Sequence, residues 1–399
     1  MDILEMPLRR EILNVYGSYD VAVVGGGIAG VAAALAAARN GAKVLLLEKM
    51  TMLGGLGTAG HIVIYLPLDD GYGNQVMGGI AEELLQLSVK YSYGDDFANW
   101  KEDGKRYRTR YNGPVFALAM EELLQEAGVD ILYDTLFAGS VIEDGWCRGL
   151  IVENKSGRGI FLCKAVVDAT GDAEVFQRAG EPCASRENSL AVWCYCTEGG
   201  EGHVQKSGSA REHGLTLLAM GKIDMTAAKH IVVEPYYGDT AEGVNRFVID
   251  GHKQLMNLVK QDKDLVLASL PSMAQIRMVR RIRGLYTLTE EDLDRHFADN
   301  IGATGDWRRP APVYEIPYRT LFTQGLNNVL AAGRCISSEG DAWDVTRVIP
   351  PAAVTGQGAG TAAVIMARDG ISAPEVPLEE LRTMLAKDHV MLDVNAGKV

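Results

Sequence analysis

Two short apolar runs flank an alanine-rich segment near the start of the chain. The first run, residues 21–24, is followed by a glycine-rich turn, and the second, residues 44–47, ends on Glu48. Residues 28–40 between them have the composition of a buried helix. Uninterrupted apolar runs of this length are typical of strands covered on both faces of a parallel sheet. The pattern therefore predicts a strand, a glycine turn, a helix and a second strand, which together form a βαβ unit.

The glycine turn carries the spacing G-x-G-x-x-G at Gly25, Gly27 and Gly30. Gly25 permits a tight turn, Gly27 lets backbone N–H groups approach a diphosphate, and Gly30 lets the helix pack closely on the strand. The helix N-terminus adds free donors and a partial positive charge. Glu48 stands where a carboxylate accepts both hydroxyls of an adenosine ribose, which favours FAD or NAD over NADP. We therefore predict a dinucleotide site.

Helices and strands continue to alternate after this unit. Helical periodicity covers residues 80–90 and 115–128, and a strand is predicted at residues 130–133. Turn signals within residues 141–163 separate three short strands that would form a β-meander. A buried strand at residues 165–169 follows them.

Irregular segments interrupt this alternation over residues 186–310. We interpret this stretch, with its one clear helix at residues 241–260, as an inserted lobe. Residues 1–18 are expected to form a lead-in helix or arm. After the lobe, two strands and two helices are predicted at residues 314–318, 328–332, 351–368 and 378–387.

The charge of the chain argues against several classes of partner. Acids outnumber bases, 52 to 39, and the net charge is −13. Nucleic acids and anionic membranes both attract basic surfaces, so we expect neither as a partner. No apolar run reaches the ~18 residues that span a bilayer, and the N-terminus has no signal-peptide core. We predict a cytoplasmic protein.

The cysteines and histidines form no recognisable metal-binding pattern. No C-x-x-C pair occurs, and Cys194 and Cys196 are too close together for a usual zinc or redox motif. We expect reduced thiols packed as small apolar side chains and predict no metal.

Separated motifs resemble one group of flavoproteins. Residues 20–58 resemble the N-terminal FAD signature of glutathione-reductase-type flavoproteins, and residues 165–180, AVVDATGDAEVFQRAG, resemble their Ala-Thr-Gly segment. Residues 275–293 and 313–363 resemble the FAD-dependent oxidoreductase family, which is distantly similar to the fumarate reductase and succinate dehydrogenase flavoproteins. The resemblance is weakest over residues 186–270.

This resemblance implies an α/β fold that binds FAD in an extended form. We expect a Rossmann-like FAD-binding domain with a β-meander, plus an inserted α+β substrate or cap domain. The FAD-binding domain would comprise residues 1–60, 114–185 and 311–399. Residues 61–113 would form a glycine-rich loop with cap elements, and residues 186–310 the inserted domain.

Groups spread along the chain are expected to hold the cofactor. A second glycine pair would let the backbone pass close to the diphosphate and ribityl chain. A helix starting near Pro351 would aim its N-terminus at the flavin N1/O2 edge. Related flavoproteins often place an acid where Arg334 stands, and Glu339 or Asp341 could substitute for it. The predicted cofactor-binding residues are Gly25, Gly27, Ile28, Ala29, Gly30, Glu48, Lys49, Gly54, Gly55, Thr58, Thr170, Gly171, Gly333, Arg334, Asp341, Pro351, Ala352 and Ala353.

Few residues suggest chemistry beyond the cofactor. The guanidinium fork of Arg347 suits the flavin or an anionic substrate, with an ion pair to Asp341 or Asp344 as the alternative. His61 follows the glycine loop and could be a base, a covalent flavin attachment point or a structural histidine. The candidate catalytic residues are Arg347, His61, Tyr65 and Glu315, of which the last two also suit packing roles.

Four arginines are clustered between residues 277 and 283. Helical spacing would place Arg277, Arg280 and Arg281 on one face, with Arg283 leading into a strand. The cluster could bind a substrate anion, or it could form salt bridges with acidic neighbours.

We predict an FAD-dependent oxidoreductase that transfers a hydride or electrons between flavin and a small organic substrate. One alternative is an NAD-binding dehydrogenase, and the other is a non-catalytic flavin-binding subunit that passes electrons to a partner. No iron–sulfur cysteine pattern is present, so such a subunit would need another chain. A homo-oligomer and an external electron acceptor are both compatible with the sequence.

Overall fold

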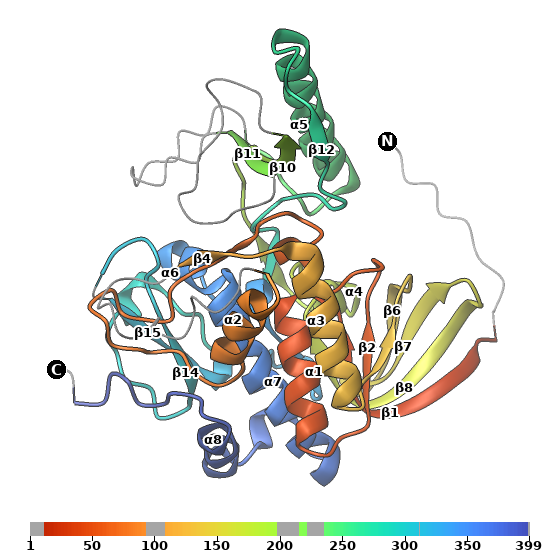
Figure 1. Cartoon of the computed structure of the whole chain (residues 1–399). Coiled ribbons are helices and arrows are strands. Elements are labelled where there is room, and N and C mark those ends of the chain that lie inside the picture. The colour runs from red at the N-terminus through yellow and green to blue at the C-terminus, as the bar shows by residue number, and fades with distance from the viewer. Residues whose placement is uncertain (1–11, 93–107, 198–214, 222–234, 311, 398–399) are drawn as a thin grey trace.

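The computed structural model describes residues 12–92, 108–197, 215–221, 235–310 and 312–397 (Figure 1). The helices are α1 (Ile28–Arg39), α2 (Ile80–Lys90), α3 (Gly113–Glu126), α4 (Glu174–Arg178), α5 (Ala241–Gln261), α6 (Gly340–Thr346), α7 (Ile349–Asp369) and α8 (Leu378–Lys387). The strands are β1 (Asn14–Val24), β2 (Val44–Leu47), β3 (Ile64–Tyr65), β4 (Thr109–Arg110), β5 (Asp130–Leu132), β6 (Leu136–Glu143), β7 (Trp146–Asn154), β8 (Gly157–Asp168), β9 (Cys183–Ser185), β10 (Ala191–Thr197), β11 (Leu215–Gly221), β12 (Leu267–Ser269), β13 (Arg280–Ile282), β14 (Asn300–Gly305), β15 (Val313–Pro317) and β16 (Val329–Ala331).

A seven-stranded sheet forms the body of the molecule. Strands β5, β2, β1, β8 and β16 pair in parallel, and β6 and β7 continue from β8 as an antiparallel meander. Strand β8 serves both parts, because residues 157–162 pair with β7 and residues 166–168 pair with β16. The predicted α/β fold with a Rossmann-like unit and a β-meander is confirmed. The strands predicted separately within residues 159–163 and at 165–169 are one continuous strand.

The first strand begins earlier than the sequence predicted. Residues 14–19 pair with residues 159–163 of β8, and Tyr16 and Tyr19 pack on Phe161 with ring centroids 5.7 and 6.0 Å apart. The alternative of a lead-in helix is therefore wrong for residues 14–18, because this pairing holds them extended. Residues 1–11 lie outside the described part of the chain.

Helices α1 and α7 cover one face of the sheet and touch each other through their backbones. A Cβ atom at Gly356 would lie 2.2 Å from the carbonyl oxygen of Ala29, and one at Gly360 would lie 2.2 Å from that of Ala33. The two contacts follow one another in the same order along both helices. The helices therefore run in the same direction where they touch, and their N-termini open at the same end of the sheet.

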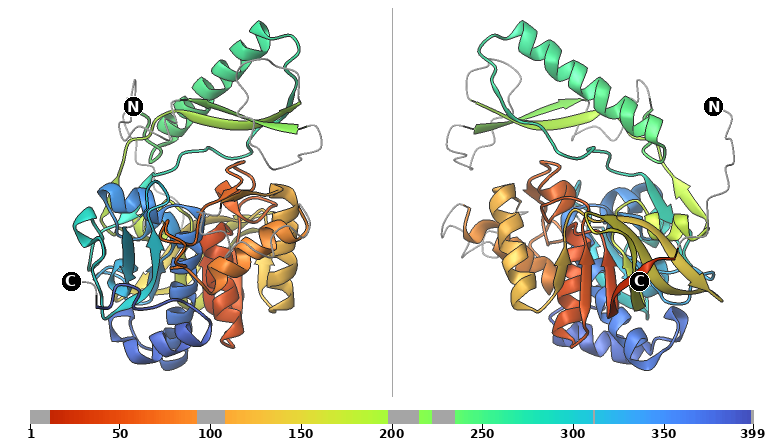
Figure 2. Two further views of the ribbon diagram at one scale, coloured as in Figure 1. Left: turned by 60° about the vertical axis from the view of Figure 1, so that its left-hand side comes forward. Right: turned by 90° about the vertical axis from the view of Figure 1, so that its right-hand side faces the viewer.

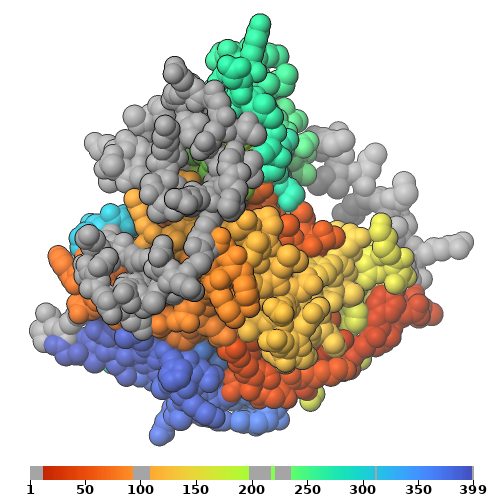
Figure 3. Space-filling model, in the orientation of Figure 1, coloured from red at the N-terminus to blue at the C-terminus, as the bar shows by residue number. Residues whose placement is uncertain are grey.

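Helix α5 and the antiparallel sheet β11-β10-β12 form a second unit that stands away from the body (Figure 2). Helix α5 forms the top of the molecule in the space-filling view (Figure 3). This unit has its own apolar core, in which Leu255 of α5 packs with Val192, Cys194 and Leu218 of the strands. The two-stranded ribbon β9–β13 lies where the chain leaves the body for this unit and returns from it. The inserted domain over residues 186–310 stays a prediction, and within that range β14 packs on α7 in the body.

The contact between α1 and α7 leads to a first prediction. We expect Gly356→Ala to lower the free energy of unfolding by about 1–3 kcal/mol, because the added methyl would overlap the Ala29 carbonyl and force the helices apart. Urea unfolding would measure the change. The control is Gly139→Ala in β6, whose Cβ would meet only the Ile151 side chain at 3.8 Å. Equal stability of the two variants would contradict the prediction.

Candidate active site

A cavity of about 900 Å³ lies between the N-terminal ends of α1 and α7, at the upper end of the usual size range for ligand pockets. Residues within segments 24–29, 47–50, 54–57 and 169–174 line it from the body, and Ala191 and Trp193 line it from the second unit. The predicted site residues that line it are Gly25, Gly27, Ile28, Ala29, Glu48, Lys49, Gly54, Gly55, Thr170, Gly171, Gly333, Arg334, Asp341, Arg347 and Ala352. The predicted residues that do not line it are Gly30, Thr58, His61, Tyr65, Glu315, Pro351 and Ala353.

The three glycines of the first turn differ in the reason why a side chain would not fit there. Gly25 has a φ of 100°, and a Cβ there would lie 2.6 Å from the Ala169 carbonyl oxygen. A Cβ at Gly30 would lie 1.8 Å from the carbonyl oxygen of Gly25. A Cβ at Gly27, in contrast, would meet no protein atom within 4 Å and would project into open space. The fold itself therefore requires Gly25 and Gly30, whereas the need for glycine at position 27 can come only from a ligand.

The second glycine pair lies directly against the first turn. Gly54 N donates a hydrogen bond to Gly26 O at 2.8 Å, and a Cβ at Gly55 would lie 3.2 Å from the Cα of Gly27. Both Gly54 and Gly55 have positive φ, at 97° and 55°. Two backbone segments with little side-chain bulk therefore form one continuous wall of the cavity.

Glu48 follows β2 directly, beside these turns, and its side chain holds them in place. Its Oε2 accepts a hydrogen bond from Gly26 N at 2.7 Å, and its Oε1 accepts one from Met50 N at 2.7 Å. Burial raises the pKa of the Glu48 carboxyl, while the backbone donors act in the opposite direction. Each oxygen can accept a further bond, so the carboxylate can hold the turn and still accept ribose hydroxyls.

Asp168 fixes the segment that returns to the cavity at the end of β8. Its Oδ1 accepts from Thr170 N at 3.1 Å and Thr170 Oγ1 at 2.7 Å, and its Oδ2 accepts from Val175 N at 2.8 Å. Its backbone carbonyl accepts from Ala332 N at 2.9 Å, which ties this strand end to β16. Complete burial raises the pKa of the Asp168 carboxyl to about 6. Asp168 was not among the site residues predicted from the sequence, although an acid inside the apolar run AVVDA was the available signal.

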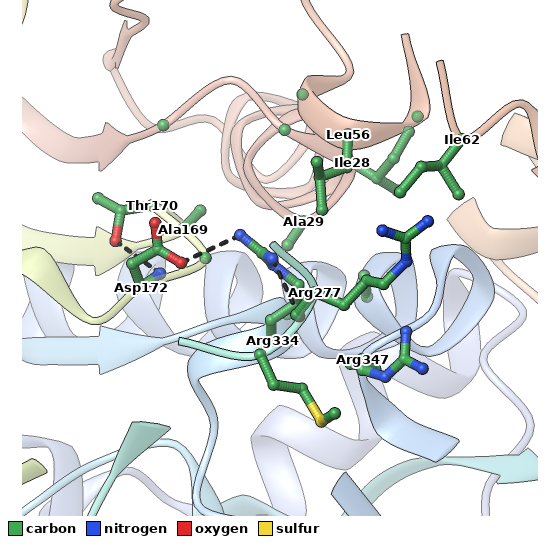
Figure 4. Close-up of a pocket in the computed structure, with 18 of the residues that line it drawn as sticks. Ile28, Ala29, Leu56, Ile62, Ala169, Thr170, Asp172, Arg277, Arg334 and Arg347 are labelled. Atoms are coloured by element: carbon green, nitrogen blue, oxygen red, sulfur yellow. Dashed lines mark hydrogen bonds and ion pairs between the residues drawn. The ribbon is translucent and has the colours of Figure 1, made fainter. Parts of the chain in front are cut away.

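Arg334 occupies the position where an acid was expected, and it binds one. Its Nη2 lies 3.1 Å from Asp172 Oδ1 (Figure 4). Its Nη1 donates to the carbonyls of Ile276 at 2.6 Å and Arg277 at 2.9 Å. Of the two proposed substitutes, Asp341 lines the cavity and pairs with Arg308 at 3.1 Å. Glu339 pairs with Arg281 instead and does not line the cavity.

Helix α7 begins at Ile349, before the predicted start near Pro351. Its second and third residues are prolines, which have no N–H, and Ala352 N donates within the helix to Val348 O at 3.0 Å. The N-terminus therefore presents the N–H of Ile349, rather than N–H groups of residues 351–354, to the cavity. The early start follows from the fixed φ of proline, which suits the first turn of a helix.

Arg347 directly follows the short helix α6 as its C-cap residue, and it lines the cavity. Its Nε lies 3.2 Å from Asp344 Oδ1, so the ion-pair alternative to Asp344 is present. Asp344 also lies 3.6 Å from Arg186, and burial lowers the pKa of the Arg347 guanidinium. The terminal nitrogens of Arg347 form no hydrogen bond with the described residues and remain available to a ligand.

The arginine cluster at residues 277–283 was predicted to be helical, but it does not form a helix. Residues 280–282 form β13, in which Arg280 pairs with Glu174 at 2.9 Å and Arg281 with Glu339. Arg277 alone of the four lines the cavity, beside Trp193 of β10. The helical prediction was wrong because β9 pairs with β13 and holds it extended. Trp193 was not selected from the sequence, which carries no local signal for it.

The other candidate catalytic residues lie away from the cavity lining, and their catalytic roles stay predictions. His61 has a φ of 54° and packs on Tyr195, and burial lowers its pKa. Tyr65 Oη donates to Ala81 O at 2.6 Å. Glu315 is fully buried and accepts bonds from four partners, namely His296 Nδ1, Phe297 N, Asn300 Nδ2 and Asn395 N. Thr58 donates to Leu53 O, within its own turn.

In the described residues, no group of three or more histidine, cysteine, aspartate or glutamate side chains is arranged to hold a metal ion. No helix among them combines the length and apolar character needed to cross a membrane.

Comparison with known proteins identifies related sequences. A family model described as FAD dependent oxidoreductase matches residues 20–193 and 222–385. The tRNA uridine 5-carboxymethylaminomethyl modification enzyme MnmG of Bacillus subtilis is 29% identical over 164 residues, which are 39% of this chain and 24% of that enzyme. Vinyl phenol reductase of Lactiplantibacillus plantarum is 36% identical over 141 residues, which are 31% of this chain and 28% of that enzyme. The matched part thus spans about a quarter of the length of these curated relatives.

A solved structure of a geranylgeranyl bacteriochlorophyll reductase-like protein from Thermoplasma acidophilum also aligns with the chain. The alignment covers 94% of this chain and 84% of that protein, with a TM-score of 0.49 and 16% sequence identity.

Gly27 provides a test that separates ligand binding from folding. We expect Gly27→Ala without flavin to unfold within about 0.5 kcal/mol of the flavin-free wild type, because no protein atom opposes the new methyl. FAD affinity, measured by titration, should fall by at least about tenfold. Gly30→Ala is the matched control and should lower stability itself by about 3 kcal/mol. Unchanged FAD affinity in Gly27→Ala would exclude the predicted role.

The buried Asp168 carboxyl predicts a pH dependence of stability. Its folded-state pKa of about 6 exceeds the unfolded value of 3.8, so the folded state binds the additional proton between these values. The stability of the wild type relative to Asp168→Asn should therefore fall by up to about 3 kcal/mol as the pH rises from about 4 to about 6. Urea unfolding across this range would measure the difference. Asp264→Asn, at an exposed site, is the control, and a pH-independent Asp168→Asn difference would contradict the assignment.

Proposed function

The chain belongs to the family of FAD dependent oxidoreductases, and on that premise we propose that it transfers a hydride or electrons between FAD and a small organic substrate. It is an enzyme whose cofactor is FAD, which sets aside the NAD-dependent alternative. The observation that carries the proposal is the open Cβ position of Gly27, which faces space that the protein does not fill. The second unit reaches the same cavity through Trp193, where a substrate could meet the cofactor.

We propose that the body holds FAD through backbone groups and one carboxylate. Glu48 would accept the ribose hydroxyls, and the N-terminus of α1 at Gly27 would receive the diphosphate. The wall formed by Gly54 and Gly55 would lie against the middle of the cofactor, because neither residue has a side chain to keep it away. Thr170 would contact it from the segment that Asp168 fixes.

The remaining lining residues suit redox chemistry next to a flavin. When bound, FAD supplies the electron or hydride transfer, and the protein supplies orientation, electrostatics and exclusion of water. Leu56, Ile62 and Ile64 form an apolar wall of the cavity. The N-terminus of α7, at Ile349, places a positive helix end beside it, which would stabilise negative charge that develops during reduction.

The purified protein provides the test. We expect flavin absorption bands that move to the supernatant after acid precipitation, and bleaching of these bands under anaerobic reduction. Addition of small organic electron acceptors should restore the bands faster in the protein than in free FAD, which is the control. A colourless protein that cannot be reconstituted with FAD would contradict the proposal. Reoxidation by a partner protein but by no small molecule would instead indicate an electron-transfer subunit.

A further inference from the structure

Arg277 carries a buried positive charge that no carboxylate of the described residues neutralises. Its Nη1 donates to the carbonyls of Ala191 at 3.2 Å and Gln275 at 2.6 Å. Its Nη2 is buried and has no hydrogen-bond partner among the described residues. Burial, and then the positive charges of Arg347 and Arg334, lower the pKa of this guanidinium to about 9. A buried cation of this kind destabilises the protein unless an anion binds to it.

The neighbouring carboxylates are engaged by other cations. Asp172 pairs with Arg334 at 3.1 Å. Asp344 is shared between Arg347 at 3.2 Å and Arg186 at 3.6 Å. Two aspartates therefore serve a group of four arginines, namely Arg277, Arg334, Arg347 and Arg186, so the positive charge is in excess.

The other acids that line the cavity also have partners of their own. Asp341 pairs with Arg308, Glu174 pairs with Arg178 and Arg280, and Glu187 accepts a hydrogen bond from Tyr237 at 3.4 Å. Glu48 accepts the two backbone bonds of its turn. None of these acids pairs with Arg277 within 4.0 Å.

Trp193 adds a second unused donor at this end of the cavity. Its Nε1 is buried without a hydrogen-bond partner in the described part of the chain. The Arg277 guanidinium carbon lies 5.7 Å from the Trp193 ring centroid, a cation–π distance that orients the two groups together. The unpaired polar atoms of these three residues are donors: Arg277 Nη2, Trp193 Nε1 and the terminal nitrogens of Arg347. Such donors require a ligand that presents hydrogen-bond acceptors to them.

We propose that Arg277, Arg347 and Trp193 form a subsite for a carboxylate group of the substrate, which is therefore a small organic acid. This inference rests on the proposed oxidoreductase function and names the class of its substrate. Figure 4 shows the guanidinium groups of Arg277 and Arg347 on the side of the cavity opposite Thr170 and Asp172. The α1 N-terminus provides a separate site for the cofactor diphosphate. A planar carboxylate matches guanidinium forks, and its two oxygens suit this small number of donors.

Titration of the flavin-loaded protein with benzoate, malonate and inorganic phosphate tests the subsite without requiring turnover. Binding is read from the flavin absorption spectrum and from the unfolding temperature. We expect both carboxylates to bind and to be preferred over phosphate. Arg277→Gln should weaken carboxylate binding by about tenfold or more, since hydrogen bonds to charged groups are among the stronger ones. Trp193→Phe should weaken it by about threefold to tenfold while the aromatic ring is kept.

Matched variants keep the result interpretable. Arg283→Gln removes one charge from the same segment at an exposed position, and it should leave carboxylate binding unchanged. Arg277→Lys keeps the charge without the fork, so it should retain FAD and bind carboxylates with intermediate affinity. If Arg277→Gln fails to fold, the lysine and Trp193→Phe variants carry the test.

Equal carboxylate affinity in wild type and Arg277→Gln would overturn the subsite, and so would binding of phosphate but of neither carboxylate. Loss of FAD from a folded Arg277→Gln protein would also overturn it, because it would assign this guanidinium to the cofactor. A wild type that holds flavin and turns over, but binds no carboxylate, would remove this inference and leave the proposed function standing. A wild type that binds no flavin would remove both.

Discussion

Direct backbone contact between α1 and α7 is the constraint on which the site depends. Gly356 and Gly360 let α7 lie against the carbonyls of Ala29 and Ala33, and any side chain there would separate the helices. Both helices begin at the cavity, so this contact sets the distance between two positive helix ends. Close packing of small residues along α1 and α7 thus fixes where the two positively polarised helix N-termini lie relative to the cavity.

Two buried carboxylates at the ends of strands hold the backbone segments that line the cavity. Glu48 holds the turn at Gly26, and Asp168 holds the segment at Thr170, each by accepting backbone N–H groups. These bonds order the backbone before a ligand arrives, so that less conformational entropy is lost on binding. Burial raises the pKa of both carboxyl groups. The backbone segments that they hold therefore depend on the protonation state of these two acids.

The parts of the structure that depend on local pattern could be predicted from the sequence. The βαβ unit, its glycine turn and the meander follow from apolar runs and turn residues within a short window. The extension of β1 back to Asn14 could not be predicted, because it depends on pairing with β8, a distant segment. Arg277 was assigned to a helix because spacing alone does not distinguish helix from strand. Its neighbour Met278 is held instead by Asn188, which bonds both its N–H and its carbonyl. The surroundings of Glu315 could not be predicted from the sequence either, because the backbone N–H of Asn395, one of its partners, lies 80 residues away along the chain.

The three glycines of the first turn are subject to different evolutionary constraints, two from the fold and one from the ligand. The carbonyl oxygens of Ala169 and Gly25 leave no room for a Cβ atom at Gly25 and Gly30, respectively, so any descendant that keeps the fold must keep glycine at both positions. Gly27 faces no protein atom, so selection can act on it only through the bound molecule. A lineage that abandoned its cofactor would retain the outer glycines and accumulate substitutions at the middle one. The residue at position 27 would therefore indicate whether a descendant still binds the cofactor.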